Sequence, residues 1–289
     1  MKVALLRCCT TPIFLPQYET STNAVLEKLG VTVVGDSEFN CCGYPLRNFN
    51  RQAYVLASAR NLALAEKRSL DLLTVCNCCY GSLKQTEAIM KEDGKLREHT
   101  TKRLNQERLG YEGRITAKHL LQLLYDDIGI GRIGQQLQRT FRGLKIAVHY
   151  GCHLLRPSET AQFDNPFTPV KFDRLVELTG AESIPWPRKL DCCGSPVWGV
   201  NDELSMSLTA KKLGSAKAAG ADYLCVACSY CQLQFDRIQK TILPAIGLDR
   251  QLPSILYTQL LGLCMGIDEA ALGLNLNQLP TKEIVRFLL

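Results

Sequence analysis

Short apolar runs alternate with longer segments of helical hydrophobic spacing along most of the chain. Strand-like runs are expected at residues 3–6, 31–34, 72–75, 146–149 and 223–226. Helices are expected at residues 22–30, 52–69, 170–178, 204–219 and 232–243. Strands that alternate with helices of this length are typical of a parallel sheet with helices on its faces. The pattern therefore predicts the α/β fold class.

The chain contains an internal repeat. The run KVALLRCC at 2–9 corresponds to KIAVHYGC at 145–152, an offset of 143 positions. The motif Cys-Cys-Gly-x-Pro begins at Cys41 and again at Cys192, and Cys-x-x-Cys begins at Cys76 and again at Cys228, with offsets of 151 and 152. The sequence therefore predicts two pseudo-symmetric Rossmann-like lobes that arose by duplication.

The repeated cysteines follow the expected strands. Cys9, Cys152 and both Cys-x-x-Cys motifs lie just past strand carboxyl ends, and the two Cys-x-x-Cys motifs open helices. Ligands bind at this edge of open α/β sheets. A helix amino terminus also favours a thiolate over a thiol. We therefore expect the cysteines to form the functional site.

Residues 101–143 are expected to connect a domain at 1–100 to a domain at 144–289. This connector has a helical pattern at 116–126, and His99 and His119 are expected at its surface. The stretch Gly-Ile-Gly-Arg-Ile-Gly at 129–134 looks like a G-x-G-x-x-G nucleotide loop. It follows a helical pattern and not a strand, so a flexible turn is the expectation.

Cysteine content is the one unusual feature of the composition. Hydrophobic residues make up 46% of the chain and charged residues 21%, as in an ordinary soluble domain. Cysteine accounts for 14 of 289 residues, about 5%, which is high for a cytosolic enzyme. The apolar run that begins at Val3 ends at Arg7, too short for a signal peptide. We expect a reducing, cytoplasmic location, where clustered cysteines bind metal or perform redox chemistry.

Charge and hydropathy argue against two other classes of protein. The net charge is +6, but basic and acidic residues are interspersed, which does not favour nucleic-acid binding. The most apolar stretch, at 255–267, is interrupted by polar residues at 257–259 and is shorter than the roughly 18 residues of a membrane span. It is interpreted as a core or interface helix.

Five thiols in each half are compatible with several kinds of site. A structural zinc site takes four ligands, usually from two Cys-x-x-Cys motifs about 15–20 residues apart. Here 148 residues separate Cys79 from Cys228. A disulfide between neighbours such as Cys41 and Cys42 would be strained. Iron–sulfur clusters fit better, and a fifth thiol indicates an open or irregular cluster or a free reactive cysteine. Zinc, disulfides and free thiols stay open as alternatives.

The two copies of the cysteine pattern resemble the duplicated cysteine-rich CCG domain of the heterodisulfide reductase B-subunit family. Further matches are HYGCHLLRP at 149–157, CQLQFD at 231–236 and LYTQLLGL at 256–263, so the resemblance covers nearly the whole chain. It implies a noncubane 4Fe-4S cluster in each half, held by five cysteines at the strand carboxyl ends. The implied cluster ligands are Cys9, Cys41, Cys42, Cys76, Cys79, Cys152, Cys192, Cys193, Cys228 and Cys231.

Two cysteines depart from the repeated pattern. Cys8 adjoins Cys9 where the second copy has Gly151, so either could be a ligand, and the offset of 143 favours Cys9. Cys78 lies inside the first Cys-x-x-Cys motif, and its match in the second copy is Tyr230. Cys78 therefore has no counterpart among the repeated thiols.

Other residues near the motifs have separate interpretations. Cys225 and Cys264 fall in apolar segments and are expected to be buried small side chains. His153 follows a ligand position and is the candidate catalytic residue, as proton donor to a leaving thiolate. Arg47 and Arg156 are candidates for attracting an acidic thiol conjugate, with solvated surface charge as the alternative.

The resemblance implies an oxidoreductase that acts on sulfur groups, reducing or reversibly forming a disulfide between the two clusters. In the type enzyme the substrate is the mixed disulfide of coenzymes M and B. Electrons reach it from a flavin-containing subunit (the A subunit) through a ferredoxin-like iron–sulfur subunit (the C subunit). This chain is therefore expected to be one subunit of a complex.

Similar modules occur in succinate dehydrogenases whose anchor-like subunit serves quinone. The alternative function is thus an electron-transfer subunit that passes electrons to quinone, with succinate dehydrogenase subunits as partners and a peripheral membrane contact. An exposed apolar face on residues 255–267 would distinguish this alternative. A third hypothesis, a zinc-stabilised interaction protein, would be separated by iron analysis.

Overall fold

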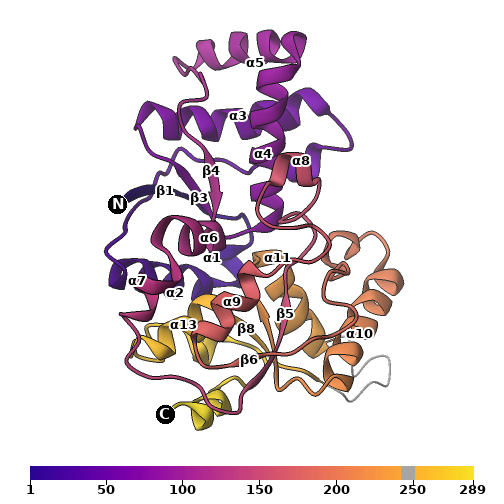
Figure 1. Cartoon of the computed structure of the whole chain (residues 1–289). Helices are drawn as coiled ribbons and strands as arrows, with labels where there is room; N and C mark the ends of the chain where they lie inside the picture. Colours follow the sequence, from indigo (N-terminus) through magenta and orange to yellow (C-terminus); the bar gives the residue numbers. More distant parts are fainter. Residues whose placement is uncertain (242–250) are drawn as a thin grey trace.

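The chain forms two lobes, each built on a four-stranded parallel sheet, in a computed structural model that describes residues 1–241 and 251–289 (Figure 1). The strand order is β2-β1-β3-β4 in the first sheet and β6-β5-β7-β8 in the second. Every strand pair is parallel. The predicted α/β fold with two similar lobes is confirmed, because both sheets have the same strand order.

The first lobe contains the amino-terminal half of the chain and part of the expected connector. Its strands are β1 (Lys2–Leu6), β2 (Thr32–Val34), β3 (Leu72–Thr74) and β4 (Ala117–His119). Its helices are α1 (Thr11–Phe14), α2 (Pro16–Lys28), α3 (Arg51–Lys67), α4 (Asn77–Glu92), α5 (Gly94–Gln106), α6 (Leu120–Gln122) and α7 (Ile130–Gly134), with a π-helical turn at Leu123–Ile128. Strands β1 and β3 are buried almost throughout, which explains their continuous apolar sequence.

The second lobe repeats this arrangement. Its strands are β5 (Lys145–His149), β6 (Glu182–Ser183), β7 (Tyr223–Val226) and β8 (Ser254–Leu256). Its helices are α8 (Ser158–Ala161), α9 (Lys171–Leu178), α10 (Asp202–Ala218), α11 (Ser229–Gln232) and α13 (Tyr257–Cys264), with a π-helical segment at Leu233–Ile238. The last two residues of the helix expected at 232–243 lie outside the described residues.

Helices α3 and α10 occupy equivalent positions and begin in the same way. Asn50 caps α3 by accepting a 3.0 Å hydrogen bond from the amide of Ala53. Asn201 caps α10 by accepting a 2.9 Å hydrogen bond from the amide of Leu204. The two caps are 151 positions apart, the offset that also relates the Cys-Cys-Gly motifs. The duplication therefore extends to local hydrogen bonds.

The lobes pack so that their sheets' carboxyl ends face one another, with α4 and α11 at the junction (Figure 1). The side-chain amide of Asn77, at the start of α4, donates a 2.8 Å hydrogen bond to the carbonyl of Tyr150. At the equivalent position on α11, the hydroxyl of Ser229 lies 3.2 Å from that of Thr11. Each lobe thus touches the loop that follows the other lobe's first strand. One hydrophobic core runs through both lobes.

Gly151 makes this close approach possible. Its φ is +74°, and a Cβ built there would lie 2.2 Å from the side-chain nitrogen of Asn77. A larger side chain would therefore both strain the backbone and push the lobes apart. In the first lobe the equivalent position is Cys8.

Three expectations for the connector are wrong. Residues Ala117–His119 form β4 and pair with β3, so the helix expected at 116–126 begins only at Leu120. Residues Ile130–Gly134 form the short helix α7 and not a flexible turn. His119 is fully buried at the end of β4, because it lies with Ala117 on the buried face of that strand, whereas His99 is partly exposed.

The apolar segment at 255–267 belongs to the interior. It forms β8 and the entirely buried helix α13, which packs against α2 of the first lobe. The expected core or interface helix is therefore a core helix. The exposed apolar face that would mark a quinone-linked subunit is absent from this described segment. Among the described residues, no helix is long and apolar enough to cross a membrane.

Candidate functional site

The cysteines of the first lobe converge beyond the carboxyl end of its sheet. Cys8 and Cys9 follow β1, Cys41 and Cys42 precede a short 3-10 turn, and Cys76 caps the amino terminus of α4. The thiol sulfurs of Cys8, Cys76 and Cys79 lie within 4.8 Å of one another. Cys42 is in hydrogen-bond contact with Cys79, and Cys41 with Cys9. We call Cys8, Cys9, Cys41, Cys42, Cys76 and Cys79 the first cysteine set.

The second lobe builds an equivalent group, the second cysteine set. Its members are Cys152, Cys192, Cys193, Cys228 and Cys231. Cys152 is in hydrogen-bond contact with Cys192, and Cys193 with Cys231. In both sets the thiols nearest the surface belong to the single cysteine and the first cysteine of Cys-Cys-Gly, while the others are buried. The repeat thus preserves both contacts and exposure.

The two sets meet at the lobe junction. The thiols of Cys76 and Cys228 lie close enough to shift each other's pKa, so the residues that open the two Cys-x-x-Cys motifs are neighbours across the lobe junction. Each motif still keeps its own Cys-Cys-Gly partner, since Cys79 contacts Cys42 and Cys231 contacts Cys193. The arrangement is therefore two adjacent sites and not one merged site.

The glycine of each Cys-Cys-Gly motif allows the tight turn that presents its thiols. Gly43 has φ +81° and Gly194 has φ +94°. A Cβ would lie 2.8 Å from the carbonyl oxygen of Tyr54 at Gly43 and 2.6 Å from that of Ser205 at Gly194. Only glycine satisfies both the backbone conformation and this close packing on α3 and α10.

Hydrogen bonds at these turns favour thiolates. Contacts with Cys152 and Cys193 lower the pKa of Cys192 to about 2, and the amide of Gly194 donates to the Cys192 sulfur at 3.4 Å. Contacts with Cys41 and Cys79 hold the pKa of Cys42 well below its usual value. In each Cys-Cys-Gly motif one thiol thus has a lowered pKa, which favours the thiolate, the form that ligates metal.

Cys78 and Tyr230 occupy matching positions inside the two Cys-x-x-Cys motifs and face the opposite lobe. The Tyr230 hydroxyl is in hydrogen-bond contact with Cys9 of the first set. Cys78 lies near Cys152 and Cys193 of the second set, and burial, opposed by a contact with Cys76, raises its pKa to about 12. The difference between the two repeats at this position thus places the thiol of Cys78 on the first lobe's side of the junction and the phenol of Tyr230 on the second lobe's side.

His153, the candidate catalytic residue, lies at the junction. Its Nε2 atom is 3.0 Å from the Tyr44 hydroxyl and 3.4 Å from a guanidinium nitrogen of Arg47. Burial, and then the Arg47 charge, lower the pKa of His153. The guanidinium of Arg47 also stacks 4.3 Å from the Tyr44 ring centre. Arg47 is exposed beside this pair, and Arg156 is exposed on the loop that follows His153.

His149 also belongs to the site, although in the sequence it is recognisable only as the first residue of the motif HYGCHLLRP. It is fully buried at the end of β5, with Nε2 3.2 Å from the Cys231 sulfur. It lies within 4.8 Å of Cys193 and Cys231, as Cys8 does of Cys76 and Cys79. Burial, and then the Lys212 charge, hold its pKa well below the usual value. A neutral imidazole can serve as a ligand or hydrogen-bond partner. In the sequence, the feature that points to His149 as a site residue is its position at the end of the predicted strand, three residues before Cys152.

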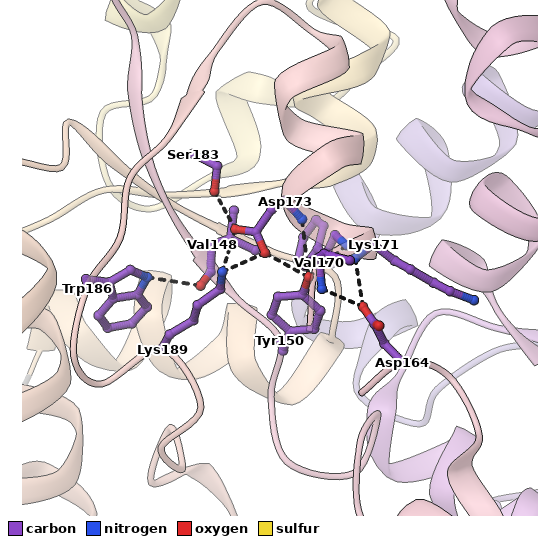
Figure 2. A network of polar contacts seen from close by, with 10 residues as sticks. Val148, Tyr150, Asp164, Val170, Lys171, Asp173, Ser183, Trp186 and Lys189 are labelled. Carbon is purple, nitrogen blue, oxygen red and sulfur yellow. Dashed lines mark hydrogen bonds and ion pairs between the residues drawn. The ribbon is translucent and has the colours of Figure 1, made fainter. Parts of the chain in front are cut away.

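A polar network holds the segment that leads into the second Cys-Cys-Gly motif (Figure 2). The Tyr150 hydroxyl donates a 2.8 Å hydrogen bond to Asp173, whose carboxylate also pairs with the ammonium of Lys189 at 2.6 Å. The Trp186 indole donates a 3.2 Å hydrogen bond to the carbonyl of Val148. The residues preceding Cys192 are thereby fixed against β5 and α9.

The first set is reached from solvent through a cavity of about 430 Å³ beside Cys9 and Cys41. Arg7, Asp36 and Asn40 contribute polar groups to its lining. Cys225 and Cys264 lie away from both sets in the interior, as expected of small buried side chains.

The donor set fits iron–sulfur centres. Each set offers at least five sulfur ligands, several of them buried, whereas a closed zinc site uses four ligands. Thiolates at strand ends and helix amino termini suit a soft, electron-accepting metal centre.

The cysteine-rich domain model named CCG matches residues 3–84 and again residues 146–236. Among relatives, the chain is 34% identical to the B subunit of the ferredoxin/F(420)H(2)-dependent CoB-CoM heterodisulfide reductase of Methanosarcina acetivorans, covering 98% of this chain and 96% of the relative. The chain belongs to the heterodisulfide reductase B-subunit family. The named members of this family are subunits of oxidoreductase complexes.

Two further similarities extend this picture. The chain is 29% identical to the 8-methylmenaquinol:fumarate reductase membrane anchor subunit of Wolinella succinogenes, over 91% of this chain and 92% of that protein. A hypothetical protein from Helicobacter pylori has a similar fold, with a TM-score of 0.76 and 16% identity, over 96% of this chain and 51% of that chain. The first shows that relatives of this family occur in a second kind of complex.

Proposed function

We propose that this protein is the subunit of a heterodisulfide reductase-like complex in which a disulfide is reduced, or reversibly formed, at two noncubane 4Fe-4S clusters. The observation that carries the proposal is the close approach of the two cysteine sets across the lobe junction, where Cys76 and Cys228 are neighbours and the residues that follow them, Asn77 and Ser229, each bond to the opposite lobe. Two adjacent sulfur-rich sites match a substrate with two sulfur atoms.

The stoichiometry of the reaction explains why one chain would contain two sites. Cleaving a disulfide to two thiols consumes two electrons and two protons. Iron–sulfur clusters, when bound, supply electrons one at a time. Two clusters facing the same disulfide would allow each sulfur to receive an electron without release of a thiyl radical. The sets lie side by side at the lobe junction, where Cys76 and Cys228 are neighbours.

In this proposal the first set holds its cluster through Cys9, Cys41, Cys42, Cys76 and Cys79, and the second through Cys152, Cys192, Cys193, Cys228 and Cys231. Cys9 is preferred to Cys8 because it follows β1 by three residues, as Cys152 follows β5. The lobe boundaries of 1–100 and 144–289, joined by 101–143, are retained as the proposed division, with β4 supplied by the joining segment.

His153 is proposed as the group that protonates a leaving thiolate. It lies at the junction of the two lobes, where its ring meets Tyr44 at 3.0 Å and Arg47 at 3.4 Å. Tyr44 is positioned to orient the His153 ring through this hydrogen bond. Arg47, exposed at the same point, would attract an acidic disulfide substrate.

The proposed partners are a ferredoxin-like iron–sulfur subunit (the C subunit) and a flavin-containing subunit (the A subunit), in the cytoplasm. A second candidate is transfer of electrons to quinone with succinate dehydrogenase-type subunits and a peripheral membrane contact. The relative named as a menaquinol:fumarate reductase anchor subunit supports it. The burial of α13 argues against the apolar face expected for that role.

Metal analysis of anaerobically prepared protein tests the proposal. Two four-iron clusters would give about eight iron and about eight acid-labile sulfide per chain. Zinc at one or two ions per chain without iron would overturn it. Turnover of a CoB-CoM-type disulfide, compared with turnover of a menaquinol analogue in the reconstituted complex, then separates the first candidate from the second.

A further inference from the structure

The two lobes differ in charge at one pair of equivalent buried positions. Asn61 on α3 lies twenty residues beyond Cys41, and Lys212 on α10 lies twenty residues beyond Cys192. The offset of 151 is the one that relates the Cys-Cys-Gly motifs. Asn61 is completely buried and Lys212 is only 1% exposed. A neutral amide in the first lobe is therefore replaced by an amine in the second.

Neighbouring hydrogen bonds confirm the equivalence of these two positions. On α3 the Ser58 hydroxyl donates to the carbonyl of Cys42 at 2.6 Å. On α10 the Thr209 hydroxyl donates to the carbonyl of Cys193 at 2.9 Å. Each hydroxyl residue lies three residues before Asn61 or Lys212, so both helices present the same face to their cysteine set.

Asn61 and Lys212 also make the same kind of contact. The Asn61 side chain accepts a hydrogen bond from the amide of Asn40 at 2.9 Å and donates to the carbonyl of Asn40 at 3.0 Å. The Lys212 ammonium donates to the carbonyl of Asp191 at 3.0 Å. Asn40 and Asp191 each precede a Cys-Cys-Gly motif. Both side chains thus anchor the start of the motif.

The surroundings of Lys212 suit a protonated amine. Its Nζ atom donates to the carbonyl oxygens of Arg188, Lys189 and Asp191, and lies 4.6 Å from the centre of the Trp186 ring. Three acceptors match the three N–H bonds of an ammonium, whereas a neutral amine has only two. The aromatic face adds a cation–π attraction. Lys212 is therefore a buried positive charge.

This charge acts on the second cysteine set. Lys212 interacts electrostatically with Asp191 and then with Cys193, Cys231 and Cys192. The Asp191 carboxylate is exposed and pairs with Arg188 at 2.8 Å, so the three thiols are the buried or half-buried groups that this charge faces.

The cations near the first set are both exposed: Arg7, which lines the cavity beside Cys9, pairs with Glu19, and Arg47 stacks on Tyr44 at the junction. Water screens an exposed charge strongly, and a buried charge much less.

We infer that Lys212 makes the second cysteine set the stronger electron acceptor of the two. This inference rests on the proposed function, in which each set holds an iron–sulfur cluster. Reduction adds negative charge to a thiolate-ligated cluster, so a fixed positive charge beside it stabilises the reduced form. Asn61 provides no such charge in the first lobe. The first electron to enter the chain would therefore reside at the second set.

The order of the two potentials in the unmodified protein is the first test. Redox titration of the anaerobically prepared full chain, followed by electron paramagnetic resonance, gives a potential for each cluster. Cys42→Ala and Cys193→Ala, which each remove one cluster, assign the signals. The second set should be reduced first, with at least a tenfold difference in the reduction equilibrium, or about 59 mV for one electron. Equal potentials, or the reverse order, would overturn the inference.

Substitution of Lys212 separates charge from anchoring. Lys212→Gln should lower the potential of the second set by about 59 mV, a tenfold change in its reduction equilibrium. The potential of the first set and the iron content should stay unchanged. Lys212→Arg keeps the positive charge, so the potential of its second set should stay close to that of the unmodified protein. The exposed neighbour Lys211, changed to Gln, is the matched control and should shift neither potential. If the Gln and Arg variants change the potential of the second set equally, Lys212 only anchors the start of the Cys-Cys-Gly motif and the inference is wrong.

These measurements distinguish the inference from the proposed function. Absence of iron from the unmodified protein contradicts the proposed function. Two clusters with no dependence of their potentials on Lys212 contradict the inference and leave the proposed function intact. The potential of the unmodified chain decides the matter even if a Lys212 variant does not fold.

Discussion

The side-chain amide of Asn77 donates a 2.8 Å hydrogen bond to the carbonyl oxygen of Tyr150, linking the first helix turn of one lobe to the cysteine loop of the other. Asn77 directly follows Cys76, and Tyr150 lies two residues before Cys152. The contact therefore fixes the relative position of the two cysteine sets. It is buried, so water cannot replace it.

Asn77→Ala should destabilise the protein by about 1–3 kcal/mol, because it leaves the carbonyl of Tyr150 without its partner in the interior. Denaturant unfolding measures the change in the free energy of unfolding. Asn48→Ala, at an exposed position, is the control and should change stability by less than about 0.5 kcal/mol. Equal stability of the two variants would show that the Asn77 contact does not hold the lobes together.

Loss of either cluster should stop disulfide turnover. Cys42→Ala and Cys193→Ala each remove a buried thiol from one set, so each should halve the iron content and reduce turnover at least a hundredfold. Cys225→Ala, which removes a buried thiol outside both sets, should retain full iron. Near-normal turnover by a variant with one cluster would make the missing cluster a relay or structural element.

Cys8 and Cys9 can be separated by paired substitutions. Cys9 follows its strand at the same distance as Cys152, so Cys9→Ala should lose the iron of the first set. Cys8→Ala should retain it, although Cys8 lies within 4.8 Å of Cys76 and Cys79. Iron content and electron paramagnetic resonance spectra measure the result. The opposite pattern would assign the ligand position to Cys8.

Replacing His153 should impair proton delivery without loss of iron. General acids contribute about a hundredfold or more to rate, so His153→Gln should lower disulfide turnover at least tenfold at full iron content. Tyr44→Phe should give a smaller decrease, because Tyr44 acts through His153 at 3.0 Å. His99→Gln, away from the junction, is the control. Unchanged turnover in His153→Gln would remove this residue from the mechanism.

Buried His119 should make the fold sensitive to mild acid. Burial lowers its pKa to about 4, below the value of about 6.5 in an unfolded chain. The unfolded chain therefore takes up the proton first, and stability falls as the pH drops from about 6.5 towards about 4. This one group accounts for about 1.4 kcal/mol of stability lost between about pH 7.5 and about pH 5.5.

The variant His119→Asn tests this pH dependence. Asn also caps a helix well and can replace the Nδ1 atom that accepts a 3.2 Å hydrogen bond from the amide of Leu121. Denaturant unfolding of wild type and variant at both pH values should show a smaller loss in the variant. An identical loss in both proteins would assign the acid sensitivity to other groups.

The sequence by itself determined strands β1, β2, β3, β5 and β7, helices α2, α3, α9 and α10, and the duplicated cysteine pattern. These features depend on local order: buried parallel strands require short apolar runs, and capped helices such as α3 and α10 require a polar residue before a helical pattern. The placement of cysteines just past the strands followed from the same rule. The strands β4, β6 and β8 were missed because segments of two or three residues carry too little periodicity to distinguish a strand from a loop or the start of a helix.

Only the tertiary structure decided how the two halves meet. The proximity of Cys76 to Cys228 and the burial of α13 under the first lobe join residues far apart in the chain, which no local pattern encodes. The same is true of the buried charge at Lys212, a residue that looks like any surface lysine in sequence. Its three carbonyl partners and Trp186 come together only when the segment before Cys192 folds over α10. Side-chain environment depends on packing between elements, and the sequence shows only the elements.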